Sequence, residues 1–204
     1  MTTITQTTDL GIRQATDADR VALTATIAAA FFDDPVCRWL LPNEERRREI
    51  LEPVFEVYVD AYLRHGETYV TADGTGAAVW LPPSTELLRA EDEEAFIGAM
   101  VEIAGSDVER MWTLDQTFAT YHPKVPHYYL QFLAVAPARQ SQGIGSALLR
   151  HGLERSDAAG TPVYFESTTH RNRVLYERHG FVCQGVFSVP DGGPELSCMW
   201  RDAH

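Results

Sequence analysis

The sequence predicts an α/β fold, in which one mixed β-sheet carries helices on both faces and forms a single domain. Apolar runs of strand length alternate along the chain with longer stretches in which apolar residues recur every three to four positions. A length of 204 residues suits one hydrophobic core. We find no internal repeat, heptad pattern or low-complexity linker. The predicted element order is therefore βααββααβαβαββ.

The first part of the chain is predicted to hold a strand, two helices and a hairpin. Residues 1–10 lack the basic start and apolar core of a signal peptide, so we interpret them as a flexible tail before a domain at 11–203. The expected elements are a strand at 12–15, a helix from Thr16 or Asp17 to about Phe32, a helical region within 44–65, and strands at 67–71 and 76–81. We expect Asp33-Asp34-Pro35 to break the first helix.

The second part of the chain alternates helices and strands. The expected elements are two helices within 85–121 separated near Gly105-Ser106-Asp107, a central strand at 128–136, a helix at 143–158, a strand at 163–167, a helix at 171–179, and strands at 181–188 and 195–201. The helical segment 84–121 precedes the central strand and is interpreted as a lid.

A turn with two glycines follows the central strand and predicts an anion site. Pro137 ends the strand because it has no backbone donor. Gly143 and Gly145 then let the N–H groups of residues 141–146 converge without side-chain obstruction. The start of the next helix adds unpaired N–H groups and a partial positive charge. We expect a phosphate or pyrophosphate here.

The spacing of the glycines in this turn narrows the choice of ligand. A dinucleotide fingerprint would need a third glycine where Leu148 stands, and the lysine of a P-loop is missing. The pattern Gln140-x-x-Gly143-x-Gly145 resembles the acyl-CoA pyrophosphate turn of the GNAT superfamily of N-acetyltransferases.

A second motif strengthens this resemblance. After the strand at 163–167 come Asn172 and then Tyr176-Glu177-Arg178-His179-Gly180-Phe181, similar to the superfamily's Asn and Tyr-Glu-x-x-Gly-Phe segment. Gly180 suits the left-handed position that closes a helix. Shorter motifs, Phe32-Asp33-Asp34-Pro35 and His127-Tyr128-Tyr129-Leu130 among them, resemble a subgroup of small-molecule acetyltransferases that includes puromycin N-acetyltransferase.

The resemblance implies a GNAT-type acyl-CoA N-acyltransferase fold and direct transfer of an acetyl group from acetyl-CoA to a primary amine. It implies that residues of the central strand, the turn and the following motif bind the cosubstrate. These residues are Leu133, Ala134, Val135, Ser141, Gln142, Gly143, Ile144, Gly145, Ser146 and Asn172. No metal is expected, because the histidines show no metal-ligand spacing.

Tyr176 and Glu166 are the expected catalytic residues. The resemblance implies that Tyr176 protonates the departing thiolate. A phenol ordinarily has a pKa of about 10 and a thiol about 8.5, so Tyr176 either has a lowered pKa or acts mainly as a hydrogen-bond donor. Glu166 lies in an apolar strand, where desolvation would raise its pKa toward that of a useful base. The alternatives are a structural pair of Glu166 with Arg171 or Arg173, a base at His127, or water alone.

The acceptor pocket is expected between the first two helices and the central strands, with these candidates: Phe32, Asp33, Asp34, Trp39, Trp80, Tyr128 and Tyr129. A net charge of −12 argues against a nucleic-acid partner and suits a cationic amine, although solubility explains it equally well. The leading function is acetylation of a small-molecule amine, in antibiotic resistance or detoxification. The alternatives are a protein or peptide N-acetyltransferase and an acyl-CoA-binding sensor without turnover.

Two further expectations concern the environment of the protein. No apolar run approaches the ~18–20 residues that cross a bilayer, so we expect a cytoplasmic protein with no membrane partner. Cys37, Cys183 and Cys198 form no C-x-x-C pair and are expected as buried free thiols. The oligomeric state is left open, with a homodimer as one option.

Overall fold

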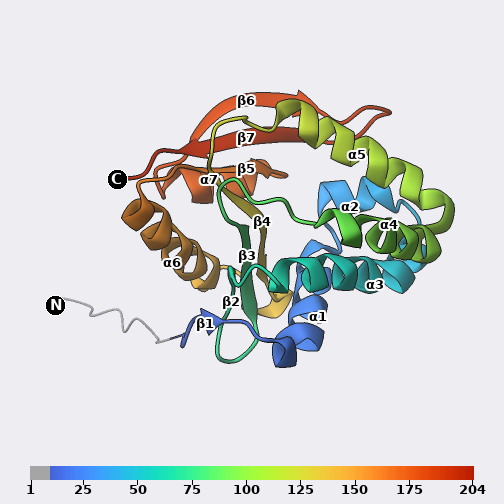
Figure 1. The fold of residues 1–204 in the computed structure, drawn as a ribbon, viewed down its shortest axis with the longest axis horizontal. Coiled ribbons are helices and arrows are strands. Elements are labelled where there is room, and N and C mark those ends of the chain that lie inside the picture. Colours follow the sequence, from blue (N-terminus) through green and yellow to red (C-terminus); the bar gives the residue numbers. More distant parts are fainter. Residues whose placement is uncertain (1–9) are drawn as a thin grey trace.

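The computed structural model describes residues 10–204, in which all strands join one seven-stranded sheet (Figure 1). The strand order is β1-β2-β3-β4-β5-β7-β6, and only β4 and β5 run parallel. The strands are β1 (Arg13–Gln14), β2 (Thr68–Val70), β3 (Gly76–Leu81), β4 (Tyr128–Val135), β5 (Val163–Ser167), β6 (Val182–Ser188) and β7 (Glu195–Arg201). The predicted mixed sheet is confirmed. The predicted tail falls mainly on residues outside the described range.

The longer helices are also where the sequence predicts them. They are α1 (Arg20–Phe31), α3 (Glu44–Leu63), α4 (Ala90–Ala104), α5 (Val108–Tyr121), α6 (Ile144–Ala159) and α7 (His170–Glu177). A 3-10 turn at Gly105–Asp107 separates α4 from α5, as expected, and another at Asp17–Asp19 precedes α1. Pro53 lies inside α3.

One short helix was not predicted. α1 ends at Phe31, which confirms the break expected at Asp33-Asp34-Pro35, and Pro35–Leu40 then forms the helix α2. Proline is well tolerated in the first helical turn, where no backbone donor is needed. Asp34 caps this helix by accepting a hydrogen bond from the Val36 N–H at 2.9 Å. The run Asp33-Asp34-Pro35 therefore ends one helix, as expected, and begins the next.

Each face of the sheet packs against its own helices (Figure 1). Successive side chains of a strand point to opposite faces. Ala77 and Val79 of β3 accordingly join the core formed with α1, α3 and α4, whereas Ala78 and Trp80 join the core formed with α6. A Cβ atom at Gly152 of α6 would overlap the Trp80 ring, so glycine is what allows this helix to approach β3.

A β-bulge interrupts β4 in its middle. Phe132 pairs with Val79 and Leu130 pairs with Trp80, which leaves Gln131 as an extra residue. The extra residue shifts the alternation of side chains between the two faces of the sheet. Leu130 therefore packs on the α6 side and Phe132 on the side of α1 and α3.

The sheet opens between β4 and β5. These two strands pair at Tyr128–Val163 and Tyr129–Tyr164, and no pairing continues beyond them. From Leu130 onward β4 pairs with β3 alone, and the rest of β5 pairs with β7 alone. This separation exposes one main-chain edge of β4 at the centre of the molecule.

Two expectations about the environment can be compared with the described residues. No helix within residues 10–204 combines the length and apolar character needed to cross a membrane. The cysteines are free thiols, but only Cys37 is buried, since Cys183 and Cys198 lie on the partly exposed strands β6 and β7. The expectation of three buried thiols was wrong for these two.

Candidate active site

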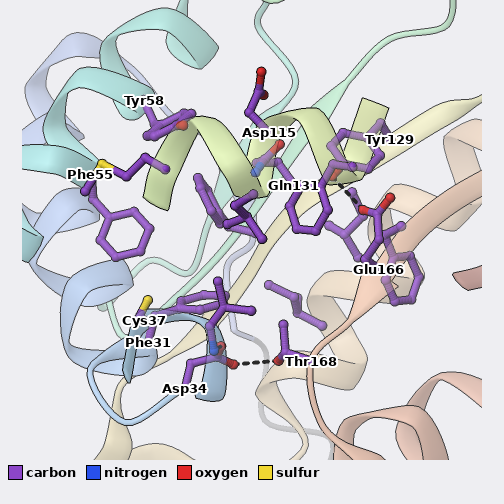
Figure 2. Close-up of a pocket in the computed structure, with 18 of the residues that line it drawn as sticks. Phe31, Asp34, Cys37, Phe55, Tyr58, Asp115, Tyr129, Gln131, Glu166 and Thr168 are labelled. Atoms are coloured by element: carbon purple, nitrogen blue, oxygen red, sulfur yellow. Dashed lines mark hydrogen bonds between the residues drawn. The ribbon is translucent and has the colours of Figure 1, made fainter. Parts of the chain in front are cut away.

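A cavity of about 630 Å³ occupies the opening between β4 and β5 (Figure 2). Its walls come from α1, α2 and α3 on one side, β4, β5 and α7 on another, and α4 and α5 above. The described lining includes three carboxylates, Asp34, Asp115 and Glu166, for which the structure gives no salt bridge. The lining also includes Lys124, so acidic side chains outnumber lysine three to one on this wall.

The glycine turn lies at the start of α6. Gly143 is the N-cap residue with a φ of 85°, and Ser141 also has a positive φ of 62°. A Cβ at Gly143 would meet no atom within 4 Å, so the space above the turn is open. The helix has no side-chain cap, and within residues 10–204 the first-turn N–H groups of Ile144, Gly145 and Ser146 have no hydrogen-bond partner. The turn is thus arranged as an anion site.

An arginine from a distant segment flanks this turn. The Arg171 guanidinium, at the start of α7, donates to Ser141 Oγ at 2.8 Å. Arg139 instead donates to Gln142 Oε1 at 3.1 Å and lies 3.2 Å from the Asp73 carboxylate. Arg171 is therefore a cation beside the turn that has no carboxylate partner in the described structure. The sequence did not predict that this arginine would lie next to the turn.

The opened edge of β4 shows which main-chain groups are free. Ala136 N–H donates to the Thr75 carbonyl at 2.9 Å, on the β3 side. Main-chain groups alternate sides along a strand, so Ala134 also faces β3, and Leu133 and Val135 face the opening. Gln140 Nε2 donates to the Val135 carbonyl at 3.3 Å, consistent with this alternation. Leu133, Ala134 and Val135 were all expected to bind the cosubstrate, but the main-chain groups of Ala134 face β3 instead of the opening.

Asn172 and Tyr176 lie one helical turn apart on α7, and both line the cavity. Thr169, not Asn172, caps this helix, because its hydroxyl accepts from the Asn172 N–H at 3.1 Å. Tyr176 is 7% exposed and its ring packs edge-on against Phe165, with 4.3 Å between centroids. Burial, followed by the nearby Asp34 carboxylate, raises the pKa of the Tyr176 phenol, so of the two sequence-based alternatives the structure favours the hydrogen-bond donor.

Glu166 points into the cavity from β5 (Figure 2). Its Oε2 accepts a hydrogen bond from the Tyr129 hydroxyl at 2.8 Å, while its Oε1 is buried and has no partner. Burial raises the pKa of this carboxyl, partly offset by the nearby hydroxyls of Tyr129 and Tyr164. Neither predicted arginine pairs with it: Arg171 contacts Ser141, and Arg173 contacts Glu177. The expected pairing of Glu166 with one of these arginines is therefore wrong.

Asp34 is a second carboxylate at the cavity wall. Its Oδ2 accepts from the Thr168 hydroxyl at 2.5 Å, which joins α2 to the end of β5 (Figure 2). Burial raises its pKa, against the hydrogen bonds from Thr168 and the α2 backbone. The contact fixes the position of α2 relative to β5.

Only some of the residues expected in the acceptor pocket line the cavity. Asp34 and Tyr129 line the cavity, as expected, but the others do not: Phe32, Asp33, Trp39, Trp80 and Tyr128. Asp33 is exposed and pairs with Arg38 at 2.6 Å, and Trp80 is 2% exposed in the core beside α6. His127 lines a smaller neighbouring pocket of about 190 Å³, with its Nδ1 2.7 Å from the Val125 carbonyl.

Several residues that line the cavity were not predicted from the sequence. Gln131 enters the cavity wall because the bulge displaces it, and its Oε1 accepts from the Tyr62 hydroxyl at 2.7 Å. Phe31, Phe55 and Tyr58 also line the cavity, although their helical spacing matches that of ordinary core residues. No local signal marks such residues.

Comparisons with known proteins agree with this geometry. A family model described as an acetyltransferase (GNAT) domain matches residues 83–183, the segment that holds β4, the turn, α6, β5 and α7. A solved structure from Corynebacterium glutamicum, described as histone acetyltransferase HPA2 and related acetyltransferase, is 28% identical, covers 95% of this chain and 96% of its own, and superimposes with a TM-score of 0.74. The chain belongs to the GNAT superfamily of acetyltransferases.

Other GNAT proteins are also similar to it. An uncharacterized N-acetyltransferase of Schizosaccharomyces pombe is 28% identical over 180 residues, which is 78% of this chain and 69% of the yeast protein. A polyamine N-acetyltransferase of Drosophila melanogaster, which forms N-acetylagmatine, shares the fold with a TM-score of 0.62 at 14% identity, over 94% of this chain and 98% of its own. The protein is an acetyl-CoA-dependent N-acetyltransferase with the GNAT fold.

Proposed function

We propose that this GNAT enzyme acetylates the primary amine of a small molecule by direct attack of the amine nitrogen on the thioester. The observation that carries the proposal is the Glu166 carboxylate, which lines the cavity at the opening between β4 and β5 and has no cationic partner in the described structure. A largely buried carboxylate is costly without a cation beside it, and a cationic amine would supply one.

The chain offers a continuous binding path for acetyl-CoA. The free N–H groups of the turn at 141–146, with Arg171 beside them, would hold the pyrophosphate. The main-chain groups of Leu133 and the N–H of Val135 on the open edge of β4, together with the Asn172 amide, would hold the pantetheine amides. These residues fit the cosubstrate that the superfamily uses.

Glu166 and Tyr176 would then move the protons of the reaction. When bound, acetyl-CoA supplies the acetyl group, which passes to the amine nitrogen as the bond from carbonyl carbon to sulfur breaks. The Glu166 carboxylate takes the first proton, which the ammonium loses before attack, because burial has raised the pKa of this carboxyl toward that of the amine. Tyr176 keeps its own proton at neutral pH and donates a hydrogen bond to the departing sulfur, which leaves as a thiolate and takes the second proton that the nitrogen loses as the amide forms.

The lid favours a small acceptor over a protein. Residues of α4 and α5, including Met100, Met111 and Phe118, line the cavity. A peptide acceptor needs an open groove, which these helices cover. A sensor without turnover would gain nothing from an unpaired buried carboxylate, since such a group costs stability.

Thiol release from acetyl-CoA tests the proposal against a panel of primary amines. The panel contains polyamines, alkylamines, an aminonucleoside such as puromycin and a lysine peptide, because the sequence motifs resemble puromycin N-acetyltransferase without fixing the acceptor. We expect amine-dependent release of free CoA and a matching acetylated product. If calorimetry shows acetyl-CoA binding but no amine raises thiol release above the amine-free rate, the proposal is wrong.

A further inference from the structure

The cavity carries a second acidic position, away from the one that holds Glu166. Asp115 of α5 lines the cavity near Tyr58 of α3. Burial, followed by the nearby Asp115 carboxylate, raises the pKa of the Tyr58 phenol to about 12. In Figure 2 Tyr58 and Asp115 lie across the cavity from Glu166, with Gln131 between them. The cavity therefore has a carboxylate at each end.

The two polar groups at this second position have no partner in the described structure. Within residues 10–204 the Asp115 carboxylate makes no hydrogen bond or salt bridge, and the largely buried Tyr58 hydroxyl makes no hydrogen bond. Desolvation at the cavity wall raises the pKa of the Asp115 carboxyl, although other parts of this residue are exposed. A carboxylate and a hydroxyl in this condition favour a ligand that donates hydrogen bonds and carries positive charge.

Aromatic rings surround the same position. The Tyr58 ring packs edge-on against Phe96 and Phe132, with centroid distances of 5.4 Å and 6.1 Å, and Phe55 packs against Phe132 at 5.3 Å. An ammonium group is attracted to the faces of such rings. Its three N–H groups can be accepted by the Asp115 carboxylate, the Tyr58 hydroxyl oxygen and water.

Lys124 does not neutralise this position. It follows the end of α5 and borders the smaller pocket beside His127 as well as the cavity. The structure gives Lys124 no salt bridge to any carboxylate of the described residues. The charge beside Tyr58 is therefore negative.

On the basis of the proposed function, we infer that the acceptor is an aliphatic diamine or a polyamine, whose second ammonium group binds to Asp115 and Tyr58 while the amine to be acetylated lies at Glu166. Asp115 is then a specificity residue, which contacts the distal end of the acceptor and takes no part in the chemical step. The separation of the two carboxylates selects the length of the acceptor.

Pairs of amines matched in length test the inference. Each α,ω-diamine from 1,3-diaminopropane to 1,6-diaminohexane is compared with the n-alkylamine that has a methyl group in place of the distal ammonium, so that 1,4-diaminobutane is paired with pentylamine. We expect the best diamine to exceed its partner in kcat/KM by roughly tenfold or more, as one charge-assisted hydrogen bond provides. The two equivalent amines of a diamine account for only about a factor of two by statistics.

Three variants locate the preference. Asp115→Asn keeps the shape of the side chain and removes its charge, so we expect the ratio of diamine to alkylamine to fall roughly tenfold, through the KM of the diamine. Tyr58→Phe keeps the ring and removes the hydroxyl, and should lower the ratio by roughly threefold. Glu109→Gln removes the same charge from an exposed position of α5 that does not line the cavity, and its ratio should equal that of the wild type.

The outcomes separate this inference from the proposed function. If no diamine exceeds its matched alkylamine by more than the statistical factor, the inference is wrong and amine acetylation still stands. A preference that Asp115→Asn leaves unchanged, or that Glu109→Gln lowers equally, also overturns it, because the selectivity would then come from the overall acidic charge. Absence of acetylation with every amine, while acetyl-CoA binds, overturns the proposed function itself.

Discussion

The Tyr129 hydroxyl lies 2.8 Å from Oε2 of Glu166, and this hydrogen bond joins the last paired residue of β4 to a residue of β5 that lies beyond the pairing. The phenol thereby connects the two strands where their backbones no longer do. It also leaves Oε1 of the same carboxylate buried and without a hydrogen-bond partner, while the Glu166 side chain lines the cavity that we assign to the acceptor amine.

Replacing Glu166 by glutamine should separate activity from stability. The amide keeps an oxygen for the Tyr129 hydroxyl but cannot take a proton, so we expect kcat/KM to fall by roughly 10²–10⁴-fold at neutral pH. Steady-state kinetics on the best amine measures this loss. Glu177→Gln, at a surface residue paired with Arg173, is the control and should retain wild-type rates. Undiminished turnover in Glu166→Gln would remove this residue from the mechanism.

We predict that Glu166→Gln is also more stable than the wild type, by an amount that depends on pH. Burial raises the folded-state pKa of Glu166, so its contribution to stability is full below the pKa of an unfolded glutamate and is lost as pH rises through the raised value. Glu166→Gln should therefore unfold at higher urea concentration than the wild type at pH 8, and the two should converge by about pH 4. Equal midpoints at both pH values would contradict the assigned burial.

Tyr176→Phe should impair the chemical step and spare cosubstrate binding. The phenol is buried beside Phe165 and keeps its proton, so removal of the hydroxyl deletes a donor without opening a cavity. We expect turnover to fall by roughly 10–10³-fold, with the acetyl-CoA Kd changed less than about twofold. Tyr128→Phe, outside the cavity, is the matched control. A variant with wild-type kcat would show that Tyr176 only packs its helix.

Much of the fold follows from signals that act over a few residues. The glycine turn could be predicted because proline and glycine restrict or free the backbone where they stand. Tyr176 and Asn172 share the cavity because helical spacing places them on one side of α7. The helix α2 was missed because Pro35 is also an acceptable first helical residue, and the cap at Asp34 decides between the two outcomes.

The cavity depends more on contacts between distant segments. Nothing near Glu166 in the sequence identifies Tyr129 as its partner, since the two strands meet only in the folded sheet. Trp80 looked like an acceptor-pocket residue because of its aromatic ring, but Gly152 allows α6 to cover it. The bulge at Gln131 likewise depends on how β4 fits against β3.

Arg171→Gln should weaken acetyl-CoA binding and make that binding less sensitive to salt concentration. The guanidinium contacts Ser141 in the turn, where the diphosphate is proposed to bind. Loss of a charged hydrogen bond of ~1.5 kcal/mol raises Kd roughly tenfold, and Kd should then vary less between 50 and 300 mM NaCl, where ionic screening strengthens. Arg173→Gln on the same helix is the control, because its partner is Glu177. Equal Kd values for the two variants would show that Arg171 does not contact the cosubstrate.

Calorimetric titration of two glycine variants with acetyl-CoA tests the central claim, that the start of α6 binds the cosubstrate diphosphate. Gly143 and Gly160 both have positive φ, 85° and 61°, and both face open space, but they stand at opposite ends of α6. Aspartate therefore strains the backbone similarly at either position, but only at Gly143 does it set a carboxylate against the diphosphate. We predict that Gly160→Asp binds acetyl-CoA with wild-type affinity and that Gly143→Asp shows no binding while remaining folded. Unaltered binding by Gly143→Asp would contradict the account.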